Sequence, residues 1–486
     1  MDTEIYKNRE TGLLAESLNI IPNEIKHIHL MGICGTAMAS LAGMLRQKGY
    51  HITGSDQNIY PPMSDFLDSL SIPVQKGYRP ENLLPRPDLV IVGNVITRQN
   101  PEAVELGLLK IPYLSMPQAL GAFAIKDKIS IVVSGTHGKT TTSSLVSHML
   151  EKAGLDPGFM IGGMVNNFQS NFKVGKGPYF VVEGDEYDTA FFDKGPKFLH
   201  YLPKIVILTS IEFDHADIFR DLDHVVETFR RLIDIIPPEG LLIANKDDGI
   251  VTAESKRARC RVITYGLNGG AEWRADNIFN HDGMTHVDVI RQDNSYASLI
   301  TPLYGSYNIS NLLSVAALSE YINIDKTALW EACKTFKGVK RRQEIRGEKN
   351  GILVLDDFAH HPTAVEKTIE AVKERYKDRR LLAVFEPRSN SSRRKVFQEQ
   401  YGAAFDMADL VFIPEPVMVE KIPPEERFSS KNLVDKLNER HLNARSFTDS
   451  RQLLEGIVSQ ARRGDVILVM SNGSFDNLHE RLLERL

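Results

Sequence analysis

One short segment constrains the fold of this chain more than any other. Ser134–Thr141, with the sequence Ser-Gly-Thr-His-Gly-Lys-Thr-Thr, follows the apolar run Ile129–Val133 and precedes Ser143–Lys152, where apolar residues fall at helical spacing. A strand, a glycine turn, a lysine–threonine pair and a helix are the parts of a phosphate-binding loop. The glycines let backbone N–H groups approach a phosphate, and the helix N-terminus adds a favourable dipole. The segment therefore predicts an α/β domain that binds a nucleoside triphosphate.

Two residues of this loop have expected roles in phosphate binding. Lys139 can reach the β- and γ-phosphates, and the hydroxyl of Thr140 can ligate Mg²⁺. The spacing is shorter than in a standard P-loop, because Val133 stands where the first glycine should be. An ordinary glycine turn before a helix is the alternative, but the flanking strand and helix both favour the nucleotide site.

Length and composition limit the remaining possibilities. The 486 residues predict about three domains, and 42% hydrophobic with 25% charged residues is typical of a globular protein. A formal net charge of −5 argues against general binding of nucleic acids or membrane surfaces. Cys34, Cys260 and Cys333 are too far apart for a local metal site and form no disulfide framework, which favours the reducing cytoplasm. The uncharged stretch Leu30–Leu45 is too short to span a membrane.

The first segment has the pattern of a nucleotide-binding βαβ unit. Its expected strands are Ile28–Met31, His51–Gly54 and Asp88–Val92, with a helix between the first two. The turn after the first strand has a Gly-x-x-Gly but not the Gly-x-Gly-x-x-Gly dinucleotide fingerprint, so a structural turn and a ligand site are both open. Asp56 stands where an acidic residue could bond a ribose hydroxyl, and Asn94 follows a strand end, where open α/β sheets bind ligands.

The rest of the chain repeats the alternation of strands and helices. In the second segment the expected strands are Tyr179–Glu183 and Ile205–Thr209, followed by an antiparallel patch around His286–Ile290 and a helix after Gly305. In the third segment the expected strands lie near Leu353–Leu355, Leu381–Phe385, Leu410–Ile413 and Val466–Met470. Strands that alternate with helices indicate a mostly parallel sheet.

The predicted fold is therefore α/β with three domains. Residues 1–25 are expected as an N-terminal extension, and 26–125 as a Rossmann-like domain. Residues 126–336 are expected as a central P-loop ATPase-type domain, and 337–486 as a C-terminal Rossmann-like α/β domain.

Carboxylates follow two strands of the expected central sheet. Glu183–Asp188 contains several of them, and Asp214-His215 follows the strand Ile205–Thr209. Mg²⁺ usually takes one or two carboxylates together with phosphates and water. Solvated turns are the common alternative, but a neighbouring phosphate loop favours metal binding. For His215 a structural role and a functional role are equally supported.

A basic run, Lys337–Arg346, lies at the junction of the second and third segments. It can be a solvated linker, and the acidity of the chain argues against nucleic-acid binding. An arginine at this place could reach the cleft between domains and stabilise charge on a transferring phosphate.

Taken together, these motifs resemble the Mur ligase family over about residues 26–486. The motifs, in the order seen in that family, are Gly135–Thr141, Asp185-Glu186, Asp214-His215, Asn308-x-x-Asn311, Arg341-Arg342-x-Glu344 and Asp356-Asp357. The resemblance implies an ATP-dependent enzyme that builds the peptide of bacterial cell-wall precursors. Its cofactors would be ATP and Mg²⁺, with small-molecule substrates, no nucleic acid, no membrane and a cytoplasmic location.

The resemblance is closest to a branch that joins a recycled tripeptide, L-alanyl-γ-D-glutamyl-meso-diaminopimelate, to UDP-N-acetylmuramate. The stretches behind this assignment are Tyr60–Ser64, Asp185–Lys194, Glu386–Asn390 and Met470–Gly473. The runner-up is the L-alanine-adding branch, which shares Asp357 and His360-His361-Pro362 but lacks the last two stretches. A nucleotide-binding regulator without catalysis is an alternative of another class, and the intact lysine, threonine, glutamate and histidine argue against it.

The family mechanism runs through an acyl phosphate, and the resemblance implies a role for each matching residue. The ATP site would comprise Gly135, Thr136, His137, Gly138, Lys139, Thr140, Thr141, Asn308, Asn311, Arg342 and Asp357. The metal ligands would be Thr140, Glu186 and His215, and the catalytic set Lys139, Glu186, His215 and Arg342. The UDP-sugar would contact Gly32, Cys34, Gly35, Thr36, Asp56 and Asn94, and the peptide Arg388 and Asn390.

Some positions depart from the family pattern. Ser210 replaces an asparagine, Tyr307 replaces a histidine, and Arg341 stands where some members have histidine. No lysine occurs between His215 and Lys246, so the carbamylated lysine that bridges the metals in many members is expected to be absent.

Overall fold

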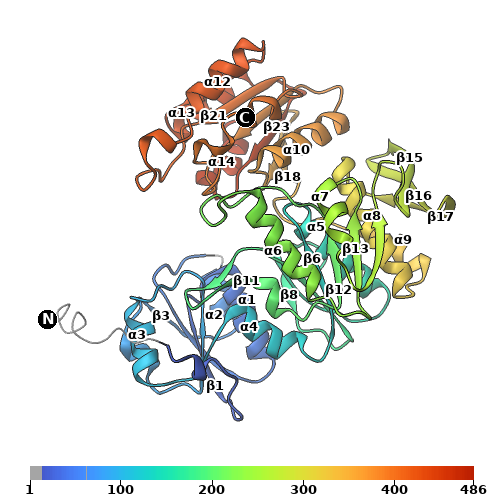
Figure 1. Cartoon of the computed structure of the whole chain (residues 1–486). Helices are drawn as coiled ribbons and strands as arrows, with labels where there is room; N and C mark the ends of the chain where they lie inside the picture. Colours follow the sequence, from blue (N-terminus) through green and yellow to red (C-terminus); the bar gives the residue numbers. More distant parts are fainter. Residues whose placement is uncertain (1–13, 62) are drawn as a thin grey trace.

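A computed structural model describes residues 14–61 and 63–486. Residues 1–13 of the expected extension, and Pro62 of the Tyr60–Ser64 stretch, lie outside the described residues. Within the described ranges the chain forms three large sheets covered by helices, coloured blue, green to yellow, and orange to red along the sequence in Figure 1. The predicted α/β class is confirmed. None of the described helices has the length and apolar character needed to cross a membrane.

The first sheet is entirely parallel and has the strand order β3-β2-β1-β4-β5. Its strands are β1 (His27–Met31), β2 (His51–Asp56), β3 (Val74–Lys76), β4 (Leu89–Val92) and β5 (Tyr113–Ser115). Its helices are α1 (Thr36–Gln47), α2 (Met63–Ser69), α3 (Pro101–Leu108) and α4 (Met116–Leu120). The order reverses between β1 and β4, which is where doubly wound sheets bind ligands.

Part of the expected extension packs on this first sheet. The side-chain amide of Asn19 donates to the carbonyl of Tyr113, 2.9 Å away, and exchanges hydrogen bonds with Gln118. Leu14 and Leu18 contact the apolar cluster on the same side. Residues 14–19 therefore belong to the packed structure.

The central sheet has ten strands in the order β17-β16-β15-β14-β13-β12-β6-β9-β7-β8. The strands are β6 (Ile129–Ser134), β7 (Gly158–Val165), β8 (Ser170–Lys173), β9 (Tyr179–Gly184), β12 (Ile205–Leu208), β13 (Leu241–Asn245), β14 (Arg261–Tyr265), β15 (Trp273–His281), β16 (Met284–Arg291) and β17 (Asn294–Thr301). The helices are α5 (Lys139–Lys152), α6 (Leu222–Asp234), α7 (Gly249–Ser255), α8 (Ser306–Tyr321) and α9 (Lys326–Thr335). The predicted antiparallel patch is confirmed as β15–β17, which projects to one side in Figure 1.

The third sheet has the order β18-β19-β23-β20-β21-β22 and is parallel except for its edge strand β18. Its strands are β18 (Glu344–Lys349), β19 (Ile352–Asp357), β20 (Leu381–Phe385), β21 (Leu410–Pro414), β22 (Ala444–Phe447) and β23 (Val466–Met470). The helices α10 (Pro362–Arg375), α11 (Tyr401–Ala404) and α12 (Ser430–Glu439) cover one face, and α13 (Ser450–Gln460) and α14 (Leu478–Arg485) cover the other.

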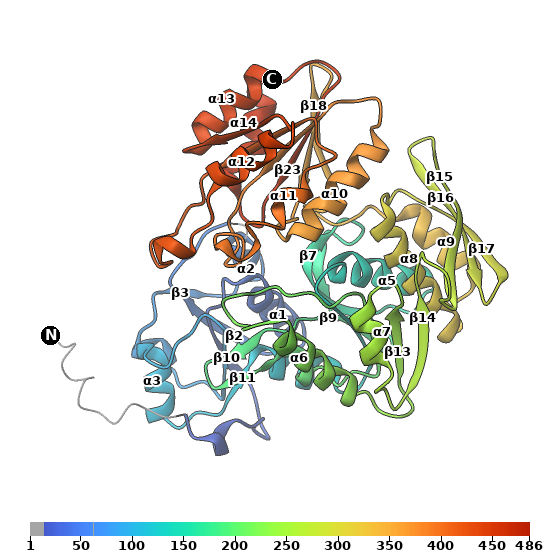
Figure 2. The same ribbon diagram turned by 45° about the horizontal axis from the view of Figure 1, so that its top comes forward.

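The unit of the central sheet lies between the other two units in Figure 1, and Figure 2 shows it beside both of them. One apolar cluster is continuous from α1 of the first unit to α6 of the central unit. A small hairpin, β10 (Asp188–Ala190) with β11 (Asp193–Pro196), brings Phe192 against Tyr113 of β5, with ring centroids 4.8 Å apart. The segment 212–217 after β12 contacts the third unit, because Asn390 donates to Asp217 over 2.7 Å and Ser391 donates to Asp214 over 2.9 Å.

The helix after the phosphate loop begins earlier than its apolar pattern indicates. The sequence predicts a helix from Ser143, but α5 begins at Lys139. Its first turns bury threonine and serine side chains, and Ser143 and Ser144 donate to the carbonyls of Lys139 and Thr140, 2.8 and 2.6 Å away. Buried hydroxyls that bond back into the helix leave no apolar periodicity to read.

Candidate nucleotide and ligand sites

The phosphate loop between β6 and α5 is fixed by the segment that follows β12. The N–H of Thr136 donates to the carbonyl of Ser210 over 2.9 Å, and the N–H of His137 donates to the Ser210 hydroxyl over 3.0 Å. The Thr209 hydroxyl in turn donates to the carbonyl of His137 over 2.5 Å. Ser210, the first departure from the family pattern, thus supports the loop through both its backbone and its hydroxyl.

Two glycines of the loop have no room for a side chain. Gly135 has φ +128°, and a Cβ there would lie 2.2 Å from the Thr209 hydroxyl and 2.8 Å from backbone atoms of Ser210. Gly138 has φ +81°, and its Cβ would lie 2.6 Å from the side-chain oxygen of Asn311. The close approach of Asn311 to the loop supports its predicted place in the ATP site.

Lys139 lies at the centre of a charged cluster. Its ammonium group donates to the Gly135 carbonyl over 2.6 Å and to Glu186 over 3.2 Å. Burial opposes the charge, but Glu186, Asp185 and Glu183 outweigh it and raise the pKa of Lys139. The other oxygen of Glu186 lies 3.6 Å from Nε2 of His215. The structure thus brings together the lysine, glutamate and histidine predicted from three separate motifs.

Thr140 links the loop to a buried carboxylate and to the third unit. Its hydroxyl donates to Glu183 over 3.1 Å, and the guanidinium of Arg342 donates to the same hydroxyl over 3.3 Å. Glu183 also accepts from the N–H of Gly162 over 2.7 Å. Burial, reinforced by Asp185, raises the pKa of Glu183. Glu183 belongs to the acidic run in which a metal ligand was expected, but its place beside Thr140 follows only from the fold.

The residues after Glu183 form a second polar group that sequence reasoning missed. Lys197 donates to Asp185 over 3.0 Å, and its ammonium nitrogen lies 3.9 Å from the ring centroid of Tyr187. Burial opposes ionisation of Asp185, but Lys197 and Lys139 outweigh it and lower the pKa of this carboxyl. The Tyr187 ring contacts His215, with centroids 5.1 Å apart. His215 therefore contacts both the ring of Tyr187 and the carboxylate of Glu186.

The junction turn and β19 form the adjoining wall. Asn308 is buried and donates to the carbonyl of Tyr304 over 2.9 Å and to the side chain of Gln343 over 3.1 Å. Asp357 accepts from the N–H of Gln343 over 2.7 Å and from that of Ala359 over 2.8 Å. Asp357 thus orients the turn that carries Arg342, and its contact with ATP stays a prediction.

Two departures from the family pattern also lie at this wall. Tyr307 is in the first turn of α8, where burial raises the pKa of its hydroxyl group, so the phenol is neutral. Arg341 has φ +61°, donates to the carbonyl of Ser471 and lies 3.5 Å from Asp356. Arg341 therefore anchors the turn to the third sheet.

A separate site candidate lies at the carboxyl ends of β1, β2 and β4 in the first sheet. The turn after β1 contains Gly32 with φ +80°, and the N–H of Cys34 donates to Asp56 over 2.9 Å. The other oxygen of Asp56 accepts from the N–H of Asn58 over 2.9 Å. Burial and Asp56 raise the pKa of the Cys34 thiol to about 11, so the thiol is uncharged. Asp56 thus orders the turn, and contact with a ribose stays a prediction.

The remaining predicted residues of this site surround the same turn. Gly35 precedes α1 and Thr36 begins it. Asn94 is exposed just after β4, the neighbour of β1 on the other side. The predicted UDP-sugar residues therefore gather at the point where the strand order reverses.

The predicted peptide residues follow β20 in the third sheet. The guanidinium of Arg388 lies 3.2 Å from the carboxylate of Glu386. The side chain of Arg388 also packs over Gly473, where a Cβ would lie 2.1 Å from Cδ of Arg388. Glu386 is buried and accepts from the hydroxyl of Ser471. The ion pair gives Arg388 a structural role, but the side chain remains 29% exposed and accessible to a ligand. Asn390 contacts Asp217 of the central unit.

Three α/β sheets, with a phosphate loop on the middle sheet that contacts the third unit, define a multidomain nucleotide-binding protein. Comparison with known families agrees with this architecture. Residues 27–128 match the Mur ligase family catalytic domain, 133–319 the Mur ligase middle domain, and 341–473 the Mur ligase glutamate ligase domain. The chain belongs to the Mur ligase family.

Individual relatives refine the comparison. The UDP-N-acetylmuramate–L-alanyl-γ-D-glutamyl-meso-2,6-diaminoheptandioate ligase of Haemophilus influenzae is 39% identical over 95% of this chain and 99% of its own length. The UDP-N-acetylmuramate–L-alanine ligase of Clostridium tetani is 32% identical over 92% of this chain and 96% of its own. A crystal structure of a murein peptide ligase from Psychrobacter arcticus covers 95% of this chain and 98% of its own, with a TM-score of 0.69 and 34% identity.

Proposed function

We propose that this protein is an ATP-dependent ligase that joins UDP-N-acetylmuramate to L-alanyl-γ-D-glutamyl-meso-diaminopimelate in peptidoglycan recycling. The observation that most strongly supports this is the 39% identity, over nearly the whole chain, to a relative named for that reaction. Relatives named for L-alanine addition are 32% identical, so that activity is the second candidate. Consumption of ATP and a nucleotide sugar is consistent with a cytoplasmic location.

In this proposal each unit has one substrate. Residues 26–125 bind the UDP-sugar, 126–336 bind ATP, and 337–486 bind the peptide and close on the nucleotide. The contacts of segment 212–217 with the third unit, and of Arg342 with Thr140, support a closed arrangement in which all three sites face one another. Exclusion of water is needed because an acyl phosphate would otherwise hydrolyse.

The residues beside the phosphate loop fit a Mg²⁺ ion. The Thr140 hydroxyl and the carboxylates of Glu183 and Glu186 are hard oxygen donors of the kind that Mg²⁺ prefers. We propose Thr140 and Glu186 as ligands of one ion and His215, 3.6 Å from Glu186, as the residue that serves a second. Bound Mg²⁺ would neutralise charge on the ATP phosphates.

The proposed reaction has two bond-forming steps. An oxygen of the lactyl carboxylate of UDP-N-acetylmuramate attacks the γ-phosphorus of ATP, and ADP leaves. The amine of the peptide then attacks the acyl carbon, and phosphate leaves from a tetrahedral intermediate. The side chains of Lys139 and Arg342 supply positive charge where the transferring phosphoryl group must lie, so positioning and charge neutralisation are the main work of the protein.

Isotope transfer tests this route. The carboxylate oxygen that attacks phosphorus is the oxygen that later leaves with phosphate. Substrate carrying ¹⁸O in both lactyl carboxylate oxygens should therefore yield one ¹⁸O in each released phosphate, as measured by mass spectrometry. Phosphate that carries no ¹⁸O would exclude the acyl phosphate, and a control without peptide reports any simple hydrolysis of ATP.

Removal of Arg388 should affect the peptide selectively. Its guanidinium can pair with a peptide carboxylate, and charged hydrogen bonds contribute about 1.5–3 kcal/mol. We expect Arg388→Ala to raise KM for the tripeptide roughly tenfold to a hundredfold and to leave KM for ATP nearly unchanged. Steady-state kinetics with each substrate varied measures this. Arg445→Ala, an exposed arginine on β22, is the matched control. An equal rise in both Michaelis constants would show that Arg388 only supports the fold.

A further inference from the structure

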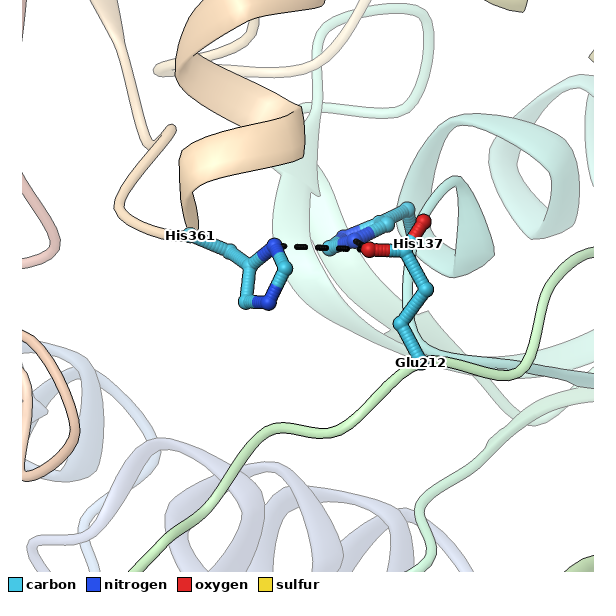
Figure 3. A group of neighbouring side chains, drawn as sticks. All are labelled: His137, Glu212 and His361. Atoms are coloured by element: carbon cyan, nitrogen blue, oxygen red, sulfur yellow. Dashed lines mark ion pairs between the residues drawn. The ribbon is translucent and has the colours of Figure 1, made fainter. Parts of the chain in front are cut away.

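A second group of ligating side chains lies beside the phosphate loop, outside the proposed Mg²⁺ site. It consists of His137, Glu212 and His361, which point toward one another in Figure 3. His137 is in the phosphate loop, Glu212 follows β12, and His361 is the N-cap of α10 in the third unit. The group therefore spans two units of the protein and depends on their contact.

The distances within this group match those of a coordination sphere. Nε2 of His137 lies 3.5 Å and Nδ1 of His361 lies 3.6 Å from the same oxygen, Oε2 of Glu212. The three atoms all lie within 4.8 Å of one another. Ligand atoms about 2.0–2.2 Å from a tetrahedral metal ion are roughly 3.4 Å apart. A metal ion placed between them would need only small movements of the side chains.

The hydrogen bonds around the group orient the ligand atoms toward its centre. Nε2 of His361 is 3.1 Å from the carbonyl of Phe213, and this bond puts the proton on Nε2 and leaves the lone pair on Nδ1. The hydroxyl of Thr363 donates to Oε2 of Glu212 over 2.7 Å. Nε2 of His137 is buried and has no hydrogen-bond partner among the described residues. The ligand atoms of Glu212 and His361 therefore converge on a nitrogen, Nε2 of His137, for which the described part of the chain provides no hydrogen-bond partner.

The charges of the group also suit a cation. Burial lowers the pKa of His361 to about 4, so this imidazole is neutral at pH 7. Burial opposes ionisation of Glu212, but His137, Thr363 and His361 outweigh it and lower the pKa of the carboxyl to about 2. The group thus offers two imidazoles and one carboxylate to a cation. Two contacts from Thr363 compete with a metal ion: its N–H donates to Nδ1 of His361 over a long 3.3 Å, and its hydroxyl donates to Oε2 of Glu212.

We propose that His137, Glu212 and His361 form a binding site for a divalent transition-metal ion of the Zn²⁺ type. Two imidazoles and one carboxylate suit Zn²⁺, whereas Mg²⁺ prefers sites made of oxygen. Because His361 belongs to the third unit and the other two ligands to the central unit, a bound ion clamps α10 against the phosphate loop. The site is distinct from that of Thr140, Glu186 and His215.

Binding of Zn²⁺ to the full chain, without ATP or the other substrates, tests this proposal. Equilibrium dialysis in excess Mg²⁺, which occupies the oxygen-rich site, gives the stoichiometry and affinity of Zn²⁺. Co²⁺ in its place should show the intense visible absorption of a tetrahedral N/O site. Glu212→Gln and His361→Asn each remove one ligand atom, and asparagine remains a good N-cap for α10. Loss of a residue that only hydrogen-bonds to a metal ligand already costs about 10–100-fold in metal affinity, so we expect at least a hundredfold loss in each variant.

A matched control and a fold check make the outcome decisive. His441→Asn removes an exposed histidine of the third unit, at φ +65°, which asparagine tolerates, and should bind Zn²⁺ as the unchanged protein does. Circular dichroism must show that both ligand variants are folded. The proposal is overturned if the unchanged protein binds no Zn²⁺ in excess Mg²⁺, or if both variants bind it with unchanged affinity and stoichiometry.

Discussion

Lys139→Ala should abolish turnover while leaving the binding of UDP-N-acetylmuramate nearly intact. The ammonium group is aimed along the phosphate loop by the Gly135 carbonyl and Glu186. Loss of one preorganised charge at a transferring phosphoryl group costs about 3 kcal/mol, which is roughly a hundredfold or more in rate. The predicted uridine site lies on another sheet and keeps its own contacts. Phosphate release and calorimetric titration with the UDP-sugar measure the two effects separately.

The matched control is Lys152→Ala, which removes a lysine from the other end of the same helix. That variant should keep turnover within about twofold, since an exposed charge in the last helical turn contributes at most about 1 kcal/mol to stability. A folded Lys139→Ala protein with near-normal turnover would contradict the assignment of the phosphate loop.

Glu102→Ala should strongly destabilise the first unit. Glu102 is fully buried, and its two oxygens accept hydrogen bonds from His29 over 2.7 Å, from Ser55 over 2.8 Å and from Asn82 over 2.8 Å. Removal of the carboxylate takes a buried hydrogen bond from each of these three residues, and Asn82 keeps only its bond to the carbonyl of Gly77. Each buried hydrogen-bonding group left unsatisfied costs about 1–3 kcal/mol, so the loss in unfolding free energy should be at least about 3 kcal/mol. Ser55 precedes Asp56, so affinity for the UDP-sugar should fall as well.

Thermal unfolding and UDP-sugar titration measure this prediction. Glu105→Ala, one turn further along α3, removes a carboxylate that lies outside this network and should change the unfolding free energy by less than about 0.5 kcal/mol. If the two variants unfold at the same temperature, the Glu102 network does not stabilise the first unit as argued.

Several central strands were predictable because their burial leaves a continuous apolar run. β6, β20 and β23 agree with the expected strands at both ends or to within one residue. The strands β3, β5, β7, β8, β13, β14, β18 and β22 were missed, and so was the β10–β11 hairpin. Strand β18 contains charged residues and is held by pairing with β19, a contact that no local pattern reveals.

The candidate site was predictable only where a motif is local. Lys139 and Thr140 follow from one loop, and their chemistry can be read from spacing alone. The partners of these residues come from distant elements: Glu183 reaches Thr140 from β9, and Arg342 reaches it from the junction turn. The group of His137, Glu212 and His361 is formed only when two units meet. His137 and His361 each belong to a recognisable motif, but the spacing of these motifs along the chain does not relate either histidine to Glu212.

The most direct test of the proposed function is a comparison of two amines under one set of conditions. With ATP, Mg²⁺ and UDP-N-acetylmuramate, the protein should release phosphate rapidly when given L-alanyl-γ-D-glutamyl-meso-diaminopimelate and hardly at all when given free L-alanine. An alanine held beside the acyl phosphate is too short to reach Arg388, so it gains none of the binding energy of that guanidinium. Equal or faster phosphate release with L-alanine would contradict the tripeptide assignment and support the L-alanine-adding activity.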